Sequence, residues 1–568
     1  MENVRRLTRR DFLKDAAKTA AVVAVSGVLP PIIGCGENGS DVTYDTLIRG
    51  GEIHDGMGNA PRIADIGIIG DRIVAIGNLT GAGVRIIEAQ GLLVCPGFID
   101  VHTHVDLTYL LLEPIDVFPK DLTGSFNYLY QGVTTVVGGN CGAGYPDIKV
   151  FFDKLDKLGG YGTNICTLAP HSLIRQVLFD PQPEQPLSDA QLLFMKGWFE
   201  TQMEQGTIGF STGLEYDPGS YSDTTELIEL AKVVRKYDGL YTSHTRDQTG
   251  TGVPPTDWGV LTSIDEAIKI GIEADIPVHV SHLQVNTPWN DVTASQILEK
   301  IENARQGPHA IDVTGCIHTY NIGWGPLNYR LPQKYKKVNG IKDIYKSGEK
   351  RLEVQAAIQK VFDEYIPAEK IQICSWEDER YNMQYISDLV KQPEFPENKG
   401  KTPAECFVDI VAKDPDVPAP YAYSDEIHGD VKDGIIPGDH IFMSSDGLAS
   451  SEDRETPIVH PRSFDNATRV LTEFVLPAEG ARMDLPSAIR KMTSLPADKF
   501  KLRERGRIEE GYFADIVVIN RGKLKSNATF EIENRYSEGV EYSLVNGVLA
   551  IDNGKATDQR AGKILRRV

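Results

Sequence analysis

Residues 96–104 read Pro-Gly-Phe-Ile-Asp-Val-His-Thr-His. This stretch contains both a predicted strand and two histidines that could bind a metal. The apolar run Phe98–Val101 has the length and composition of a strand in a buried parallel sheet. The run ends in His102 and His104, whose side chains lie two residues apart and can share one face of a strand. A lone His-x-His is usually incidental, so its meaning depends on what the rest of the chain places beside it.

Further short apolar runs follow at intervals, and helical patterns separate them. Two examples are Thr225–Tyr237 and Ser263–Ile270, with apolar residues at i, i+3 and i+4. The complete set of candidate strands is Phe98–Val101, Thr134–Val137, Ile165–Leu168, Ile208–Ser211, Leu240–Ser243, Val278–Ser281, Ile311–Thr314 and Ile441–Ser444. Eight βα repeats predict an α/β fold, a TIM-like (β/α)8 barrel over residues 96–504.

The interval between the seventh and eighth runs is too long for a single loop. It contains a helical pattern at Leu352–Tyr365 and a strand pattern at Ile371–Ser375. We therefore expect an inserted subdomain at about 324–385. The two flanks of the barrel, residues 43–95 and 505–568, read as short strands punctuated by glycines. Neither flank has many apolar residues of its own, so we expect the two to combine in one small β-sandwich.

The first 35 residues have the features of an export signal. Thr8–Lys14 reads Thr-Arg-Arg-Asp-Phe-Leu-Lys and resembles the twin-arginine export motif, and Ile32–Cys35 resembles a bacterial lipobox, in which the cysteine is acylated. The intervening apolar stretch is too short and interrupted for a membrane span. We expect export to the periplasm or cell envelope with lipidated Cys35 as the only membrane contact. The alternative is an amphipathic helix with an incidental cysteine.

The acidic composition argues against nucleic acid as a binding partner. The chain has 568 residues and a formal net charge of −21, from 59 basic and 80 acidic residues. Binding to nucleic acid needs clustered Lys and Arg, so we expect none and look instead for a small-molecule substrate. The seven cysteines are widely scattered, which is unlike the disulfide framework of a small secreted fold. We expect mostly buried free thiols, and we make no prediction of the oligomeric state.

Residues able to bind a metal stand at the ends of five of the eight runs, on the rim where barrels of this kind carry their catalytic groups. They are His102, His104, Cys141, His244, His282 and Asp446. Imidazole, thiolate and carboxylate together suit Zn²⁺. Each residue alone is weak evidence, and the joint placement on one rim is what predicts a metal site. His171 and His318 are rim candidates of second rank.

Several motifs resemble one family. They are Pro96–His104, Gly139–Gly142, Ser211–Tyr216, His244–Arg246, Ser281–His282, Ser445–Gly447, His460–Arg462, Ala488–Ala497 and Gly511–Val518. In this order they resemble the D-aminoacylases (N-acyl-D-amino-acid deacylases) of the amidohydrolase superfamily, from about residue 43 to the C-terminus. The resemblance implies a tight zinc site at Cys141, His244 and His282, and a weaker second site at His102, His104 and Asp446. It also implies hydrolysis of a linear amide, which suits a catalytic zinc with three protein ligands and Asp446 as general base and acid.

The chain departs from this family around the substrate. Gln284 stands where deacylases usually carry a carboxylate-binding lysine, and Gln248 stands where they carry a glutamate. The usual Asp-x-Tyr-Pro-Tyr is replaced by Cys316–Tyr320. Our candidates for substrate binding are Gln284, His318, Tyr320 and Arg462. We expect a substrate that lacks a free α-carboxylate or presents it differently from a simple N-acyl-D-amino acid.

Two other functions compete with this one. A cyclic-amide hydrolase of the hydantoinase or dihydroorotase type would carry a metal-bridging lysine at the end of strand four, where this chain has Gly213-Leu214-Glu215. A non-catalytic, lipid-anchored binding protein would not need a general base, yet Asp446 is retained with the whole ligand set.

Overall fold

The computed structural model describes residues 42–567 except for a set of short segments. The segments left out are 112–119, 180–182, 249–257, 286–290, 332–334, 336–343, 345–346, 365, 377, 414–420, 426, 428, 453–458, 478–479 and 531–533. The expected signal peptide and Cys35 lie outside the described residues. Among the helices that are described, none has both the length and the apolarity needed to cross a membrane.

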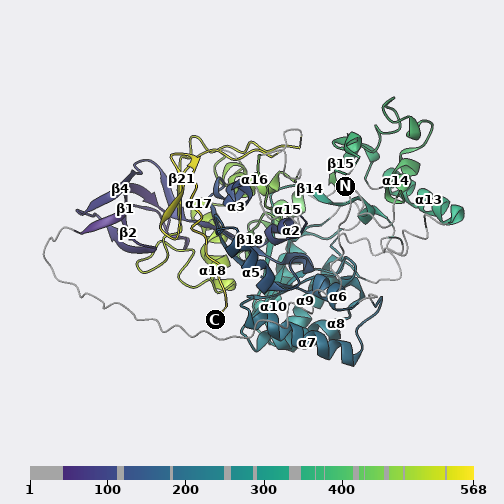
Figure 1. Cartoon of the computed structure of the whole chain (residues 1–568), viewed down its shortest axis with the longest axis horizontal. Coiled ribbons are helices and arrows are strands. Elements are labelled where there is room, and N and C mark those ends of the chain that lie inside the picture. Colours follow the sequence, from purple (N-terminus) through teal and green to yellow (C-terminus); the bar gives the residue numbers. More distant parts are fainter. Residues whose placement is uncertain are drawn as a thin grey trace.

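Strands from the two flanks of the barrel form one sheet of nine strands, seen as purple and yellow arrows at one end of Figure 1. They are β1 Thr43–Ile53, β2 Arg62–Ile69, β3 Arg72–Gly77, β4 Ala82–Glu88, β5 Leu93–Pro96, β19 Ile516–Ile519, β20 Val540–Val545, β21 Val548–Asp552 and β22 Lys555–Ala556. The junction is an antiparallel pair, β5 with β19, in which Val94 lies opposite Val518. β1 pairs with β2, β4 and β5, so hydrogen bonding is continuous. The β-domain expected from the two chain ends is therefore present, and one continuous network of hydrogen bonds joins its strands.

Each of the eight apolar runs forms a strand, which confirms the α/β barrel class. The strands are β6 Phe98–Asp100, β7 Val133–Gly138, β8 Asn164–Thr167 with its continuation β9 Ala169–Pro170, β10 Gly209–Gly213, β11 Leu240–His244, β12 Val278–Val280, β13 Val313–Ile317 and β18 Ile441–Met443. All pair in parallel, in two sheets ordered β6-β7-β8 and β18-β13-β12-β11-β10-β9. Between β18 and β6, the His104 amide donates to the Gly447 carbonyl at 2.7 Å, and the Asp446 amide donates to the His102 carbonyl at 2.8 Å.

Helices alternate with these strands and cover their outer side (Figure 1). They are α2 Val105–Leu111, α3 Lys120–Gly124, α4 Phe126–Leu129, α5 Ile148–Lys157, α6 His171–Leu178, α7 Asp189–Glu204, α8 Thr224–Arg235, α9 Val260–Ala274, α10 Ala294–Gln306, α15 Gly429–Ile435, α16 Arg462–Arg469, α17 Leu485–Met492 and α18 Ser494–Lys499. α8 shows why they form. Asp223 caps its N-terminus by accepting from the Glu226 amide, and Leu227, Leu230 and Val234 bury one face.

The segment between β13 and β18 builds a subdomain with its own core. Its described residues include an antiparallel sheet ordered β14-β17-β15-β16 and the helices α13 and α14. Their bounds are β14 Ile322–Pro326, α13 Gly348–Glu364, β15 Ile371–Ser375, β16 Gln384–Tyr385, α14 Pro403–Val411 and β17 Tyr421–Asp425. The expected end at residue 385 is too early, because β14 pairs with β17 from Ile322 opposite Asp425 to Pro326 opposite Tyr421. A strand that follows 385 is thus needed to complete the sheet.

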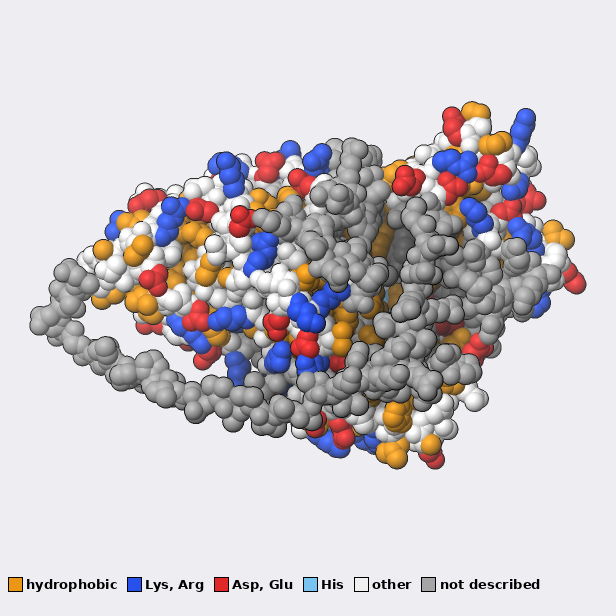
Figure 2. All heavy atoms as spheres, viewed as in Figure 1, with side chains coloured by type: hydrophobic (Ala, Val, Ile, Leu, Met, Phe, Trp, Pro, Cys, Tyr) orange, Lys and Arg blue, Asp and Glu red, His pale blue; other side chains and the backbone are white. Residues whose placement is uncertain are grey.

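The described surface carries both signs of charge. On the face drawn in Figure 2, acidic and basic side chains are interspersed over the β-sheet domain, the barrel helices and the inserted subdomain. Many of these charges lie in exposed pairs such as Lys149 with Asp153 and Lys300 with Asp265. Exposed pairs of this kind contribute little to stability, so the fold depends mainly on its buried apolar clusters.

Candidate metal centre

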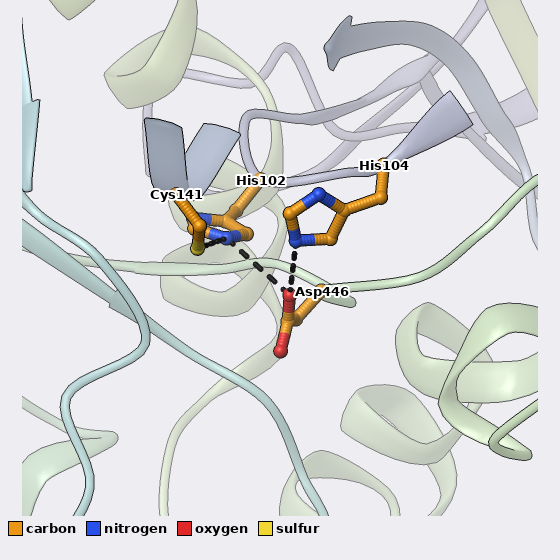
Figure 3. A group of neighbouring side chains, drawn as sticks. All are labelled: His102, His104, Cys141 and Asp446. Carbon is orange, nitrogen blue, oxygen red and sulfur yellow. Dashed lines mark hydrogen bonds and ion pairs between the residues drawn. The ribbon is translucent and has the colours of Figure 1, made fainter. Parts of the chain in front are cut away.

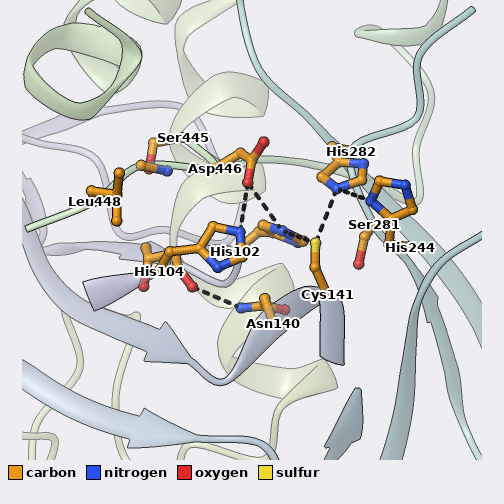
Figure 4. A network of polar contacts seen from close by, with 12 residues as sticks. His102, His104, Asn140, Cys141, His244, Ser281, His282, Ser445, Asp446 and Leu448 are labelled. Atoms are coloured by element: carbon orange, nitrogen blue, oxygen red, sulfur yellow. Dashed lines mark hydrogen bonds and ion pairs between the residues drawn. The ribbon is translucent and has the colours of Figure 1, made fainter. Parts of the chain in front are cut away.

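The six residues proposed as ligands converge at one end of the barrel strands (Figure 4). His102 and His104 follow β6, and Cys141 lies in the 3-10 turn η1 (Asn140–Gly142) after β7. His244 is the last residue of β11, while His282 and Asp446 follow β12 and β18. Because parallel strands end at a common rim, residues that are far apart in sequence meet here.

The first group of ligands surrounds the carboxylate of Asp446 (Figure 3). Asp446 Oδ1 lies 3.0 Å from His104 Nε2 and 3.3 Å from His102 Nε2. Cys141 Sγ lies 3.3 Å from the same nitrogen, His102 Nε2. Two imidazoles, one thiol and one carboxylate thus face a common point, with His102 fully buried.

The second group shares Cys141 with the first. Cys141 Sγ lies 3.2 Å from His282 Nε2, and that nitrogen lies 3.0 Å from His244 Nδ1. The three ligand atoms lie within 4.8 Å of one another, and all three residues are buried. One sulfur therefore stands between two sets of nitrogen ligands, which is the arrangement needed for a thiolate shared by two metal positions.

Three of the candidate ligands have left-handed backbone conformations. The φ angles are 53° at Cys141, 26° at His282 and 52° at Asp446. Non-glycine residues rarely adopt such values, and the strain costs on the order of 1–3 kcal/mol at each position. Glycine at position 142 lets the turn after Cys141 pack closely against Ser172, because a Cβ here would come 2.5 Å from Ser172 Oγ. These left-handed conformations thus occur at the residues whose side chains point towards the proposed metal positions.

Electrostatics keep Asp446 ionised. Burial alone would raise the pKa of Asp446, but the charge of Arg462 and the hydrogen bonds from His102 and His104 outweigh it and hold the pKa well below its usual range. Arg462 Nη2 contacts Asp446 Oδ2 at 2.6 Å, leaving Oδ1 to the histidines. Burial lowers the pKa of His102 to about 4, so this imidazole is neutral and one of its two ring nitrogens carries a lone pair.

Further polar groups fix the segments that carry the ligands. Asp100 accepts hydrogen bonds from the amides of His102 and Ser445, at 3.2 Å and 3.0–3.1 Å. Burial raises the pKa of Asp100 to about 7. Asn140 donates to the carbonyls of Val101 and Thr103, each at 3.3 Å. These bonds connect the ends of β6, β7 and β18, so they hold the ligands of the first group in a common frame.

Two residues that the sequence reasoning did not assign to the site support His244. Glu215 Oε2 lies 3.1 Å from His244 Nε2, and Tyr216 Oη lies 3.0 Å from His244 Nδ1. A carboxylate behind an imidazole fixes its tautomer and orientation for metal binding. Glu215 stands at the end of strand four, the position at which a cyclic-amide hydrolase would carry a metal-bridging lysine. This position in the sequence could have indicated that Glu215 belongs to the site.

The residues expected to bind substrate have different surroundings. His318 Nε2 lies 3.3 Å from Arg462 Nη1, so it borders the metal ligands through Arg462. Gln284 is half-buried, two residues past His282. Tyr320 instead donates its hydroxyl to both oxygens of Asp465, at 2.7 and 2.8 Å. The hydroxyl of Tyr320 is thus held by Asp465, and the expected contact of Tyr320 with substrate stays a prediction.

Arg462, expected to clamp a substrate carboxylate, is already engaged with protein groups. One end of its guanidinium contacts Asp446 and the other contacts His318. Its Nε is buried and has no hydrogen-bond partner among the described residues. Part of the expected clamp is therefore used to position Asp446. His171, the other rim candidate, pairs with Glu226 at 3.1 Å and belongs to neither ligand group.

The donor set fits a zinc ion. Zn–N bonds of about 2.0 Å and Zn–S bonds of about 2.3 Å place the ligand atoms of a tetrahedral site roughly 3.3–3.6 Å apart. The separations of 3.0 and 3.2 Å between His282 Nε2 and its two neighbours are close to these values. Burial raises the pKa of the Cys141 thiol well above its usual range, so its ionisation requires a cation at the sulfur.

Comparisons with known proteins agree with this site. A model of the amidohydrolase family matches residues 438–551. The chain is 30% identical over 547 residues to the D-aminoacylase of Alcaligenes xylosoxydans xylosoxydans, covering 92% of this chain and 98% of that protein. It is 28% identical over 550 residues to the N-acyl-D-glutamate deacylase of the same organism, covering 92% and 96%.

Solved structures give the same result. The fold matches a D-aminoacylase crystal structure with a TM-score of 0.73 and 26% identity over 92% of this chain and 100% of that one. The same values describe the match to the N-acyl-D-glutamate deacylase of Bordetella bronchiseptica, solved with zinc and a phosphonate inhibitor that mimics the tetrahedral intermediate. Fold and site define a metal-dependent hydrolase that acts on C–N bonds other than peptide bonds. The chain belongs to the amidohydrolases, in the D-aminoacylase family.

Proposed function

We propose that this protein is a zinc-dependent deacylase that hydrolyses the linear amide bond of N-acyl-D-amino acids or close derivatives. The observation that carries the proposal is the single sulfur of Cys141, which faces His102 on one side and His282 on the other. A closed structural zinc site would not need a second ligand group with an ionised carboxylate beside it. The relatives named above act on N-acyl-D-amino acids, which favours this substrate class.

The residues divide the work as follows. Cys141, His244 and His282 would hold the tight zinc ion, and His102, His104 and Asp446 would hold a weaker second one. Bound zinc polarises a carbonyl and acidifies water. Asp446 would accept the proton of the attacking water and pass it to the leaving nitrogen, since its carboxylate is ionised at neutral pH. Arg462 keeps the carboxylate oriented through Oδ2, so that Oδ1, the oxygen that faces His102 and His104, would make this transfer.

The proposal is tested with a panel of N-acyl-D- and N-acyl-L-amino acids. Release of the free amino acid is measured with the zinc-loaded protein. We expect turnover of D-substrates ahead of their L-isomers. Activity on a cyclic amide such as dihydrouracil, with none on the linear panel, would contradict the proposal.

We predict that the substrate carboxylate is weakly held at position 284. A neutral Gln284 cannot make the charge-assisted contact of a lysine, a difference of about 1.5–3 kcal/mol, or roughly one to two decades in kcat/KM. Gln284→Lys is therefore expected to raise kcat/KM for N-acetyl-D-methionine but not for its amide, which has no carboxylate. Steady-state kinetics with both substrates measure the effect. A wild type that strongly prefers the free acid, with no gain in Gln284→Lys, would show that the carboxylate is already well bound.

We also propose that the precursor is exported by the twin-arginine route and anchored through Cys35, on the strength of its two N-terminal motifs. Replacing Arg9 and Arg10 with lysine is expected to stop export, while the same change at Arg5 and Arg6 serves as the matched control. Cell fractionation measures the location, and mass spectrometry measures acylation of Cys35. Finding an intact Met1 on protein from the native envelope fraction would refute the proposal.

A further inference from the structure

The two histidines of the second ligand group, His244 and His282, are supported by chemically different side chains. His244 Nε2 lies 3.1 Å from the carboxylate of Glu215. His282 Nδ1 lies 2.7 Å from the amide nitrogen of Gln248. A carboxylate can only accept a hydrogen bond from an imidazole, whereas an amide can either donate or accept. The Glu215 carboxylate therefore fixes the tautomer of His244, whereas the tautomer of His282 depends on which end of the Gln248 amide faces it.

The contact with the amide nitrogen of Gln248 favours the tautomer of His282 whose proton is on the wrong nitrogen for metal binding. Because Gln248 Nε2 donates to Nδ1, the proton of the neutral ring is on Nε2. That nitrogen is the atom that faces Cys141 Sγ at 3.2 Å and His244 Nδ1 at 3.0 Å. A protonated Nε2 has no lone pair for a metal. For His282 to act as a ligand, its proton must move to Nδ1, and Nδ1–H then needs an acceptor.

Gln248 can supply that acceptor by turning its amide. Its Oε1 is buried and has no hydrogen-bond partner among the described residues, so the oxygen gives up no bond when it turns towards His282. Within the described part of the chain, the amide nitrogen would lose one bond besides that to His282, its 3.2 Å contact to the Ser281 carbonyl. Gln248 is 3% exposed, so water does not readily replace it.

We propose that Gln248 sets the metal affinity of the Cys141–His244–His282 position by selecting the tautomer of His282, which makes it a positioning residue for the metal site. The proposal rests on the zinc centre proposed above. With the amide nitrogen on Nδ1, His282 is held in a form that cannot bind the ion. With the amide oxygen on Nδ1, it is held as a ligand. A glutamate here would only accept, and so would favour the ligand form at all times.

The test measures zinc affinity directly. The full-length mature protein is stripped of metal, and Zn²⁺ is titrated in competition with a chromophoric chelator. Removing a group that orients a metal ligand typically costs 10–100-fold in metal affinity. We expect Gln248→Met to weaken zinc binding by about that factor, and Gln248→Glu to bind zinc about tenfold more tightly than wild type.

The matched control is Gln202→Met. Gln202 is also a fully buried glutamine with one unpaired amide atom, but it contacts the Ile148 amide and is remote from the ligands. The zinc affinity of the Gln202→Met variant should equal that of wild type. A purely structural role for Gln248 would lower the thermal stability of the metal-free protein and would give Gln248→Glu no tighter binding. Wild-type affinity in both Gln248 variants would overturn the inference while leaving the zinc centre intact. Failure of wild type itself to bind zinc would overturn both proposals.

Discussion

Asp446→Asn is expected to lower kcat by about 10²–10⁴-fold while zinc stays bound at Cys141, His244 and His282. Asparagine keeps the size and position of the side chain, but its amide cannot accept a proton from water and return it to the leaving nitrogen. Asp446 belongs to only one of the two ligand groups, so its replacement leaves the other complete. Turnover and zinc content are measured on the same preparation.

A second buried carboxylate provides the control for this experiment. Asp465 accepts hydrogen bonds from Tyr320, and burial raises the pKa of Asp465 to about 7, so this carboxyl is about half ionised at neutral pH and Asp465→Asn removes less charge than Asp446→Asn. This variant should retain most of the wild-type kcat. If Asp446→Asn instead turns over at near wild-type rate with zinc bound, Asp446 is not the proton acceptor.

Cys141→Ala is expected to lose the tightly bound zinc and, with it, nearly all activity. Cys141 is the one residue common to both ligand groups, so its removal takes a ligand from each. A methyl group replaces the thiolate, and two imidazoles alone are a poor zinc site. Zinc content after exhaustive dialysis is measured by elemental analysis.

Cys166→Ala controls for the loss of a buried thiol. Cys166 is fully buried in β8 and its sulfur contacts the Val136 carbonyl at 3.8 Å, away from the ligands. This variant should keep its zinc, although the small cavity lowers its stability. Stoichiometric, tightly held zinc in Cys141→Ala would contradict the assignment of the shared ligand.

The barrel could be predicted from sequence because each strand is a short apolar run. Such a run is recognised from the composition of a few consecutive residues. Phe98–Asp100 and Ile441–Met443 form neighbouring ends of the barrel wall as expected. The convergence of His102, His244 and Asp446 could also be predicted, because strand order places the ends of parallel strands on one rim. The family motifs added the pairing of Cys141 with His282.

The contacts behind the ligands could not be predicted in this way. Whether Arg462 meets a substrate or Asp446 depends on the path of the loop before α16, and no local pattern encodes that path. Glu215 and Gln248 reach their histidines across neighbouring strands, so their roles appear only in three dimensions. The end of the inserted sheet was missed for a related reason, since β17 pairs with β14 across a long sequence separation.

The most direct test of the account is anomalous X-ray diffraction at the zinc absorption edge, from crystals of protein purified without chelator. We predict a strong anomalous peak within bonding distance of Cys141 Sγ, His244 Nδ1 and His282 Nε2, at about 2.0–2.3 Å from each. A second, weaker peak beside His102, His104 and Asp446 would agree with it. Diffraction that shows no anomalous peak at Cys141 in active protein would contradict the central claim.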